Sequence, residues 1–418
     1  MKHLLKILIC SFLSLSVAHT VKAAGYQLNE YSAINMGRSF AGIGIAGDDF
    51  SAIGYNPAGM SFNKTSGIQA NASLIRLFSH FKGTDGDRRV NDGQGRTGRG
   101  HTSIERVLPS LFAQYRMNDK LTAGIGIYVP FGLATDYPNG WFGERHGALS
   151  EITVLNISPA LSYQINDIVS IGGGPNLQYA KAHLTSSGSN VSGDDWSAGY
   201  SVGFTIRPLD QLRFGIAYRS KVTHHLKGDL DRLTLPTPGG PMNFSGDVHA
   251  KITTPETAIL SAAWDINDNW TLTGTARWTR WTRFDTLNIF LDSNAPDPYT
   301  HLVSSTPEKW RNTGYYALGA DYRVNQNWTV RMGLGYDMTV IRSGGMRTPR
   351  IPDGRRVWNS LGFSYAYNNM QLDVGYAHIF VYGGHAKGTD SLNAIYGKPN
   401  IKYSSDANMF SLGFQYKF

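Results

Sequence analysis

Long stretches of the sequence alternate, residue by residue, between apolar or aromatic side chains and small or polar ones. The clearest is 328–338, where every second position is apolar or aromatic: Trp328, Val330, Met332, Leu334, Tyr336 and Met338. The same period of two runs through 212–219 and 155–163. Because side chains on a β-strand point alternately to its two faces, these stretches predict strands whose faces meet different surroundings.

Two features of these strands favour a barrel in a membrane over a soluble sandwich. They are longer than the roughly five or six residues usual for a soluble strand. Their ends carry aromatic residues, as in the interfacial girdles of membrane barrels: Trp264, Trp270, Trp278, Trp281, Trp310, Trp328 and Trp358. Aromatics reach 12% and charged residues only 17%, which excludes a disordered chain. A mean hydropathy of −0.27 argues against a helical membrane protein.

The connections between strands give the strand number. Six short breaks rich in Asn or Asp are typical of tight hairpins: 118–119, 166–167, 208–210, 267–269, 325–327 and 368–369. Seven longer polar connections alternate with them: 83–103, 137–149, 186–194, 228–243, 291–308, 343–354 and 383–400. Together they join 14 strands, with short turns at one end and long loops at the other. The predicted fold class is therefore all-β, a 14-stranded antiparallel transmembrane β-barrel.

The first 23 residues have the features of a secretory signal peptide. Lys2 and Lys6 form a positive start, 7–18 is a short apolar core, and 21–23 is a small-x-small cleavage pattern. The single cysteine, Cys10, falls inside this segment, so the predicted mature chain has none.

The last strand alternates up to the final residue, with one face apolar: Phe410, Leu412, Phe414, Tyr416 and Phe418. An alternating strand that ends on Phe resembles the assembly signal of outer-membrane barrels. Together with the signal peptide, it predicts a location in the bacterial cell outer membrane.

Residues 24–65 do not follow the strand period and are rich in irregularly spaced Gly and Ala. A barrel of this size has a lumen wider than its own side chains can fill. We therefore predict three regions: a signal peptide at 1–23, an N-terminal plug, or hatch, in the lumen at 24–65, and the transmembrane β-barrel at 66–418.

A series of short motifs runs in order along the predicted mature chain. They are 24–30 (AGYQLNE), Gly37-Arg38, Asp48-Asp49, Asn56-Pro57-Ala58, 131–135 (FGLAT), Tyr218-Arg219-Ser220, Thr254-Pro255-Glu256, and Ile351-Pro352-Asp353 with Arg356 and Trp358. In this order they resemble the FadL family of outer-membrane long-chain fatty-acid transporters, whose plug signature corresponds to Asn56, Pro57 and Ala58. The resemblance implies a plugged 14-stranded barrel that takes up hydrophobic molecules. It also implies a route: capture at the extracellular loops, transfer to a lumen pocket and lateral exit near the third strand.

The third predicted strand, 121–136, carries Pro130, Phe131 and Gly132 in its middle. Pro130 has no N–H for the ladder, and Gly132 permits a sharp bend. Broken pairing that faces lipid would be costly unless protein or a cavity covers it. The sequence therefore predicts a kink over the plug, with a strand that ends at Val129 as the alternative.

A fatty acid needs an apolar tunnel with one or two basic groups for its carboxylate. The resemblance implies two basic carboxylate partners, but the aligned positions here are Ser186 and Thr306, which carry no charge. The candidate carboxylate partners in this chain are Lys181, Arg219 and Lys309. The family also includes channels for neutral aromatic hydrocarbons, which need no such partner. The predicted ligand is a hydrophobic small molecule, a long-chain fatty acid or a neutral aromatic hydrocarbon.

The resemblance further implies that the start of the plug contacts the ligand and shifts when the ligand binds. The residues concerned are Ala24, Gly25, Tyr26, Gln27 and Leu28. Several basic side chains on inward-facing positions also suit an anion: Arg213, Arg219, Lys221, Arg277 and Arg331.

A further group of basic residues lies at the sixth long loop: Arg342, Arg347, Arg350, Arg355 and Arg356. They can be solvated loop charges, or they can contact lipopolysaccharide phosphates or attract anionic ligands.

Nothing in the sequence predicts a cofactor, a metal or a catalytic residue. His224 and His225 are adjacent on a strand, so their rings point to opposite faces and cannot share one metal. A net charge of +8 is modest for 418 residues and gives no case for nucleic-acid binding. The predicted protein is not an enzyme but a monomer with two kinds of partner, a hydrophobic ligand and the outer-membrane lipid with its lipopolysaccharide. A lipid hydrolase that uses His146 or His378, and an adhesin or phage receptor built on the long loops, are the alternatives.

Overall fold

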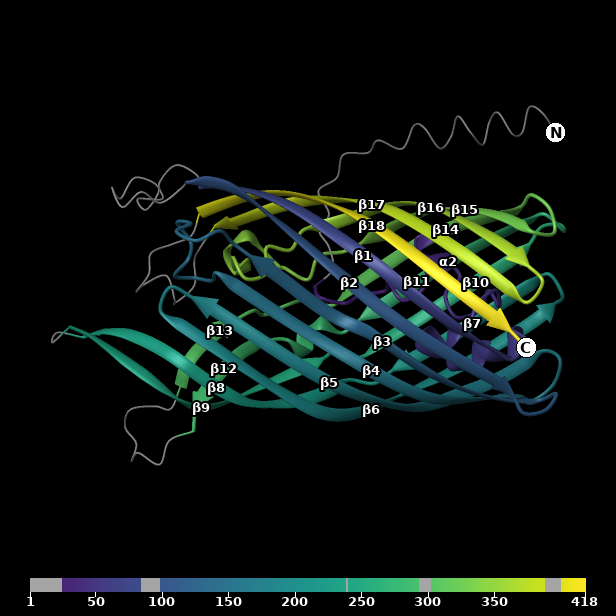
Figure 1. Cartoon of the computed structure of the whole chain (residues 1–418), viewed down its shortest axis with the longest axis horizontal. Coiled ribbons are helices and arrows are strands. Elements are labelled where there is room, and N and C mark those ends of the chain that lie inside the picture. Colours follow the sequence, from purple (N-terminus) through teal and green to yellow (C-terminus); the bar gives the residue numbers. More distant parts are fainter. Residues whose placement is uncertain (1–24, 84–97, 238–239, 293–301, 388–399) are drawn as a thin grey trace.

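The strands form one closed antiparallel barrel (Figure 1). The computed structural model describes residues 25–83, 98–237, 240–292, 302–387 and 400–418. Closure comes from β1 (Gly67–Gly83), which pairs with β2 (Arg99–Arg116) on one side and with β18 (Asn400–Lys417) on the other.

Between β2 and β18 the strands follow one another around the wall in chain order. Their bounds are β3 Leu121–Asp136, β4 Leu149–Gln164, β5 Val169–Ser186, β6 Ser189–Leu209, β7 Leu212–Arg219, β8 Val222–Thr237, β9 Gly240–Thr254, β10 Thr257–Asp265, β11 Trp270–Thr279, β12 Thr286–Leu291, β13 Leu302–Pro307, β14 Thr313–Arg323, β15 Trp328–Asp337, β16 Arg355–Tyr367 and β17 Met370–Lys387. Four strands of the barrel are each interrupted once along their length, so each carries two labels: β7 and β8, β9 and β10, β11 and β12, and β13 and β14. The barrel therefore has 14 antiparallel strands, which confirms the predicted fold class.

The six predicted short turns are present, and four of them share one local cause. The side-chain oxygens of Asn118, Asn166, Asn267 and Asn325 each accept the backbone N–H groups two and three positions ahead, at 2.8–3.0 Å. These Asx turns replace the ladder bonds that the backbone loses where it reverses.

Two of the predicted long loops are wrong. The segments 186–194 and 228–243 continue as paired strands, β5 with β6 and β8 with β9. Their many polar residues led to the loop prediction, but Val191, Leu230 and Leu233 pack into a small buried cluster with Val248 and Ile289.

The outer face carries the apolar side chains that the alternation predicts. Leu334 on β15 and Leu361 on β16 are 46% and 49% exposed. Near the short turns, Trp328 packs on Tyr365 across neighbouring strands with ring centroids 4.7 Å apart. None of the described helices is long and apolar enough to cross a membrane.

The described N-terminal residues form three short helices inside the barrel (Figure 1). These are α2 (Ala33–Gly37), α3 (Ala52–Tyr55) and η1 (Pro57–Phe62). α2 lies against β15, β16 and β17, and η1 lies against β4, β5 and β6. We call residues 25–66 the plug.

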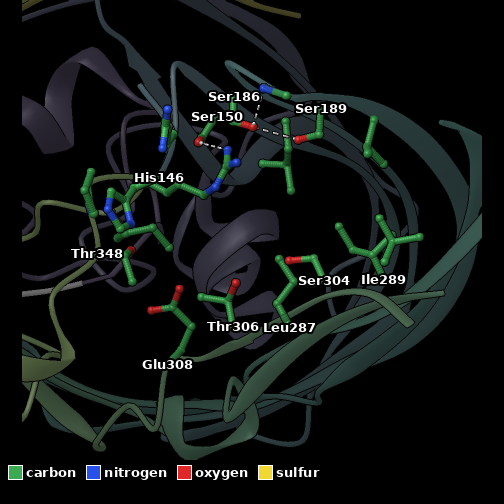
Figure 2. A pocket seen from close by; sticks show the side chains of 18 of the residues that line it. His146, Ser150, Ser186, Ser189, Leu287, Ile289, Ser304, Thr306, Glu308 and Thr348 are labelled. Atoms are coloured by element: carbon green, nitrogen blue, oxygen red, sulfur yellow. Dashed lines mark hydrogen bonds between the residues drawn. The ribbon is translucent and has the colours of Figure 1, made fainter. Parts of the chain in front are cut away.

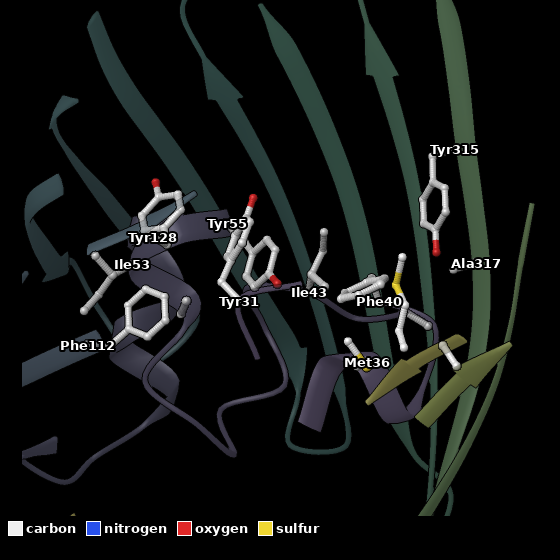
Figure 3. Close-up of a cluster of buried hydrophobic side chains, with 14 of the residues drawn as sticks. Tyr31, Met36, Phe40, Ile43, Ile53, Tyr55, Phe112, Tyr128, Tyr315 and Ala317 are labelled. Carbon is white, nitrogen blue, oxygen red and sulfur yellow. The ribbon is translucent and has the colours of Figure 1, made fainter. Parts of the chain in front are cut away.

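One buried cluster joins the plug to the wall (Figure 3). Tyr31 of the plug stacks on Tyr55 at 4.6 Å and contacts Tyr128 of β3 at 4.6 Å between ring centroids. The aromatic core of this barrel is thus shared by plug and wall, and these ring contacts hold the plug against β3.

Candidate functional site

The wall is interrupted between β2 and β3. Their ladder stops at the pair Leu111 and Ile127, although β3 runs on to Asp136. On the other side, β3 keeps its pairing with β4 but shifts register between Tyr128 and Phe131, which flank Pro130. The strand therefore continues past Val129 and bends at the proline, and the upper part of β3 has no ladder to β2.

The start of the plug occupies the edge that β2 leaves unpaired. The amide of Leu28 donates to the carbonyl of Pro130, and the amide of Gly132 donates to the carbonyl of Tyr26, both at 2.9 Å. Gln27 lies opposite Phe131 as an isolated antiparallel bridge. A short plug segment thus acts as a strand on the inner side of the gap. Asn56 of the plug signature caps η1 by accepting from the Ala58 amide at 3.1 Å.

Tyr26 fixes this segment by packing into a cage of aromatic rings. Its ring centroid lies 4.8 Å from that of Trp281, 5.6 Å from Phe284, 5.6 Å from Trp310 and 5.9 Å from Phe131. Burial raises the pKa of the Tyr26 hydroxyl, and that hydroxyl has no hydrogen-bond partner within the described structure. The cage therefore holds Tyr26 through ring packing alone.

Gly25 is held by Asp353, at the end of the loop between β15 and β16, and by Arg356, at the start of β16. Its amide donates to Oδ2 of Asp353 at 3.4 Å, and its carbonyl accepts from Arg356 at 3.2 Å. Burial raises the pKa of Asp353 to about 6, although Arg356 lies beside it at 3.4 Å. The predicted signal peptide and Ala24 lie outside the described residues.

A cavity of about 350 Å³ opens at the gap. We call it the window cavity. It is mainly apolar, and its lining comes from both faces of the wall: Tyr26, Leu28, Ile379 and Met409 from within, and Val107, Pro109 and Thr153 from the gap and the outer side. The cavity is therefore lined by residues from the lumen side and from the outer side of the wall, at the gap between β2 and β3.

A second cavity of about 390 Å³ lies nearer the long loops (Figure 2). We call it the upper cavity. Its lining mixes apolar side chains with hydroxyl and charged groups, and Figure 2 shows Leu287 beside Ser304 and Thr306. Leu133, Ile152 and Ile351 line both cavities, so the two are neighbours. Ser186 and Thr306, the uncharged residues noted in the sequence, both line the upper cavity.

Two arginines of the sixth long loop supply positive charge to the upper cavity. Arg347 is 3% exposed; it donates from Nε to the Asp353 carbonyl and from Nη1 to the His385 carbonyl, each at 2.8 Å. Its Nη2 is buried without a partner. Nη1 of Arg350 donates to the carbonyls of Leu149 and Thr185 and to Oγ of Ser150, at 3.1–3.2 Å.

These arginines bond only to uncharged acceptors. No carboxylate of the described chain forms an ion pair with Arg347 or Arg350 within 4.0 Å, and Glu308 is the one acid among the residues that line the cavity. Removal from water lowers the pKa of Arg347, and lowers that of Arg350 to about 10. Both guanidinium groups stay cationic at neutral pH. Sequence reasoning noticed these residues as loop charge but did not place them in the site.

The three carboxylate partners proposed from the sequence lie elsewhere. The side chains of Lys181 and Lys309 are exposed, and neither lines the upper or the window cavity. Arg219 is buried, but it donates to the Tyr128 hydroxyl at 3.0 Å and to the Gly54 carbonyl of the plug. The structure brings none of the three together.

Other inward arginines hold the plug. Arg38 of the plug bonds to Asp48 at 3.0 Å and to Asp321 of β14 at 2.7 Å, and Arg331 of β15 contacts the same two acids. Asn29 accepts from Arg277. These charges are therefore neutralised or occupied by plug contacts, which corrects their interpretation as a ligand-binding surface.

The histidines of the sequence analysis do not form a shared site. His224 is buried on the inner side, between Asp195 and Gln178, while His225 is exposed. His146 lines the upper cavity, whereas His378 contacts Asn408. Within the described residues, no group of three or more His, Cys, Asp or Glu could hold a metal ion.

Comparison with known proteins places this geometry among transport proteins of the outer membrane. A family model described as outer membrane protein transport protein (OMPP1/FadL/TodX) matches residues 14–418. The long-chain fatty acid transport protein of Escherichia coli O6:H1 is 25% identical, over 95% of each chain.

Solved structures share the fold. A FadL homologue of Pseudomonas aeruginosa superposes with a TM-score of 0.84 at 25% identity, covering 94% of this chain and 100% of its own. The toluene transporter TodX of Pseudomonas putida gives a TM-score of 0.71 at 17% identity, covering 94% and 99%, and shows likeness of fold alone.

Proposed function

This chain belongs to the FadL/TodX family of outer-membrane transport proteins, and from that membership we propose that it is a diffusion channel for long-chain fatty acids. The ligand is captured at the long loops, enters the upper cavity, passes to the window cavity and leaves sideways between β2 and β3. Among the similar proteins, one is named as a long-chain fatty acid transport protein and another as a toluene transporter. The two ligands differ in that a fatty acid carries a carboxylate head group, so the choice between them depends on whether the site can bind a carboxylate.

The observation that carries the choice is the pair Arg347 and Arg350 beside an apolar cavity wall. Within the described chain, neither guanidinium has a carboxylate within ion-pair distance, although the charges of Asp353 and Glu308 act on Arg347 and Arg350 respectively, so a ligand carboxylate would add a direct partner. The apolar side chains that line part of the upper cavity, Phe284, Leu287 and Val303, suit the tail. A neutral aromatic ligand would leave the two cations as they are.

The lateral route is supported by the gap between β2 and β3 and by the window cavity within it. An unpaired strand edge at membrane depth is tolerated only where protein or a cavity covers it. Here the plug covers the edge from within, as the bonds of Leu28 and Gly132 show. Displacement of the plug start would then open a continuous path from the lumen to the lipid.

The test compares oleate and toluene. Cells that lack their own fatty-acid transporter express the unaltered chain, Arg350→Gln, or Lys309→Gln, whose side chain lies outside both cavities. We expect oleate uptake at low concentration to fall about tenfold in Arg350→Gln, as for the loss of a charge-assisted hydrogen bond. Toluene uptake should be unchanged in Arg350→Gln, and uptake of both ligands should be unchanged in Lys309→Gln. Uptake of toluene alone would favour the aromatic-hydrocarbon channel, and uptake of neither would contradict the proposal.

A further inference from the structure

One ion pair spans the mouth of the window cavity. Nη2 of Arg106 on β2 lies 3.2 Å from Oε1 of Glu151, and its Nε lies 3.3 Å from the same oxygen. Glu151 belongs not to the neighbouring β3 but to β4, one strand further on. The two side chains therefore reach across the bent upper part of β3.

The alternation of side chains shows where the Arg106 side chain runs. Arg106 has the same parity on β2 as Ile104 and Ser110, both buried on the lumen side. Glu151 alternates on β4 with Ser150 and Ile152, which face the upper cavity, so Glu151 lies on the outer side. The Arg106 guanidinium thus passes from the lumen side of β2 to the outer side of β4. It does so where β2 and β3 are unpaired, and both partners line the window cavity.

The pair also lies at the edge of the apolar outer band. Below it on β2, towards the short turns, the outward residues Val107, Leu111 and Tyr115 are 62%, 53% and 61% exposed. Above it, towards the long loops, the outward residues are Glu105 and Ser103. A change from apolar to polar outward residues marks the interface between acyl chains and head groups. Arg106 is therefore placed at head-group level, with apolar wall directly beneath it.

We propose that Arg106 is the exit residue for the ligand head group, an inference that rests on the proposed transport and lateral exit. A departing carboxylate replaces Glu151 on the Arg106 guanidinium while the ligand tail enters the membrane along Val107 and Leu111. The leaving molecule then has the orientation of a lipid in the outer leaflet. A neutral molecule must break the same ion pair and offers Arg106 no replacement. Arg106 thus selects anionic amphiphiles, with one carboxylate and a long apolar tail, over neutral ones.

A neighbouring ion pair serves as the matched control. Arg76 of β1 and Glu105 of β2 are directly opposite in the ladder, with Nη2 and Oε1 2.5 Å apart, and are about as exposed as Arg106 and Glu151. That pair joins strands that are already hydrogen-bonded and does not line either cavity. It reproduces the charge and exposure of the Arg106 pair without its place in the gap.

The experiment measures uptake of labelled oleate and labelled oleyl alcohol, which share one tail and differ in the charge of the head group. Cells without their own transporter express the unaltered full chain, Arg106→Gln, Glu151→Gln or Arg76→Gln. Folding of each barrel is checked by the shift in its electrophoretic mobility on heating. We expect Arg106→Gln to lower the ratio of oleate to oleyl alcohol uptake about threefold or more, the range of a half-exposed ion pair. Glu151→Gln should keep or raise that ratio and speed both ligands, because the pair is broken while Arg106 remains.

An unchanged ratio in Arg106→Gln overturns the inference, and so does an equal fall in Arg76→Gln. In either case, normal uptake of oleate by the unaltered chain leaves the transport proposal standing. Absence of uptake of both ligands by the unaltered chain contradicts the proposed function itself, and the inference falls with it.

Discussion

The amide of Leu28 donates to the carbonyl of Pro130 at 2.9 Å, so the plug bonds to the wall at the residue where the wall bends. β3 has no ladder to β2 beyond Ile127, and its inner edge would otherwise present unpaired backbone groups. The same contact covers the lumen side of the gap and gives a backbone group at the kink a hydrogen-bond partner. Any movement of residues 26–28 must therefore replace these backbone bonds, by water or by ligand, as it opens the window.

The close contact between Gly132 and Leu28 makes the kink sensitive to a side chain. A Cβ at Gly132 would lie 2.8 Å from Cδ1 of Leu28, too near for ordinary packing. We expect Gly132→Val to push the plug start from the β3 edge at a cost of about 1–3 kcal/mol, with the barrel still folded. Oleate uptake should change, and proteolysis near residue 28 should increase. Gly274→Ala, where the nearest atom lies 3.6 Å away, is the control; an equal effect there would count against the prediction.

The aromatic cage predicts opposite results for two changes at Tyr26. Tyr26→Ala removes a ring that four neighbours surround, and should weaken docking of the plug start by about 3–5 kcal/mol. Tyr26→Phe removes only a buried hydroxyl without a partner, and should be neutral or stabilise docking by about 1 kcal/mol. Hydrogen exchange at the amides of residues 26–28 measures both. A loss of protection in Tyr26→Phe equal to that in Tyr26→Ala would show that the hydroxyl matters more than the ring.

The buried charges beneath the plug should be intolerant of single changes. Asp321→Asn leaves Arg38 and Arg331 with one shared carboxylate, Asp48, in a buried setting. We expect a loss of about 3–5 kcal/mol in plug docking, seen as increased ion conductance through the barrel. Asp268→Asn, in the exposed turn after β10, should leave conductance unchanged. Equal conductance in both variants would contradict the plug-anchoring role.

The start of the plug should be held more firmly in acid than at neutral pH. The pKa of Asp353 is about 6 instead of 3.8, so the folded protein keeps a proton that the free side chain would lose. Docking of the plug start buries this carboxyl, so docking weakens as pH rises from about 4 to about 6, by about 3 kcal/mol if Asp353 acts alone, although the Gly25 hydrogen bond itself favours the carboxylate. Burial also raises the pKa of Glu30, which acts in the same direction. Hydrogen exchange at residues 26–28, corrected for its intrinsic pH dependence, should show protection falling as pH rises. Asp353→Asn should make this fall smaller. A fall of equal size in Asp353→Asn would show that another group causes it.

The barrel could be predicted from sequence because its signals are local. Each turn Asn, such as Asn118, bonds to its own neighbours, and the side-chain alternation of 328–338 is a property of one strand. The kink followed from Pro130 and Gly132 for the same reason, since a missing N–H and a missing Cβ act on their own backbone. The hairpin at 186–194 was missed because its residues show no apolar alternation, although its pairing is as local as that of the short turns.

The charged residues of the site depend on the fold and were harder to assign. From the sequence, Arg331 is expected to be an unpaired charge in the lumen. In the structure it contacts Asp48, which is far away in the sequence. Arg350 looks like a solvated loop residue until the loop folds back over the upper cavity. Arg106 and Glu151 belong to strands that are not neighbours, and their contact crosses the part of β3 that has no ladder to β2. In the sequence, Arg350 was noted only within the cluster of arginines at 342–356, Arg331 only as an inward-facing charge, and Arg106 and Glu151 not at all.

Blocking the window itself tests the central claim most directly. The predicted mature chain has no cysteine, so Leu108→Cys, in the lining of the window cavity, can be modified alone with a bulky thiol reagent. Leu334→Cys, exposed on the outer face of β15 and outside that lining, is the control. Lateral exit predicts that modification at position 108 stops oleate uptake while modification at position 334 leaves it intact. Full oleate uptake by a chain shown to be completely modified at position 108 would contradict exit between β2 and β3.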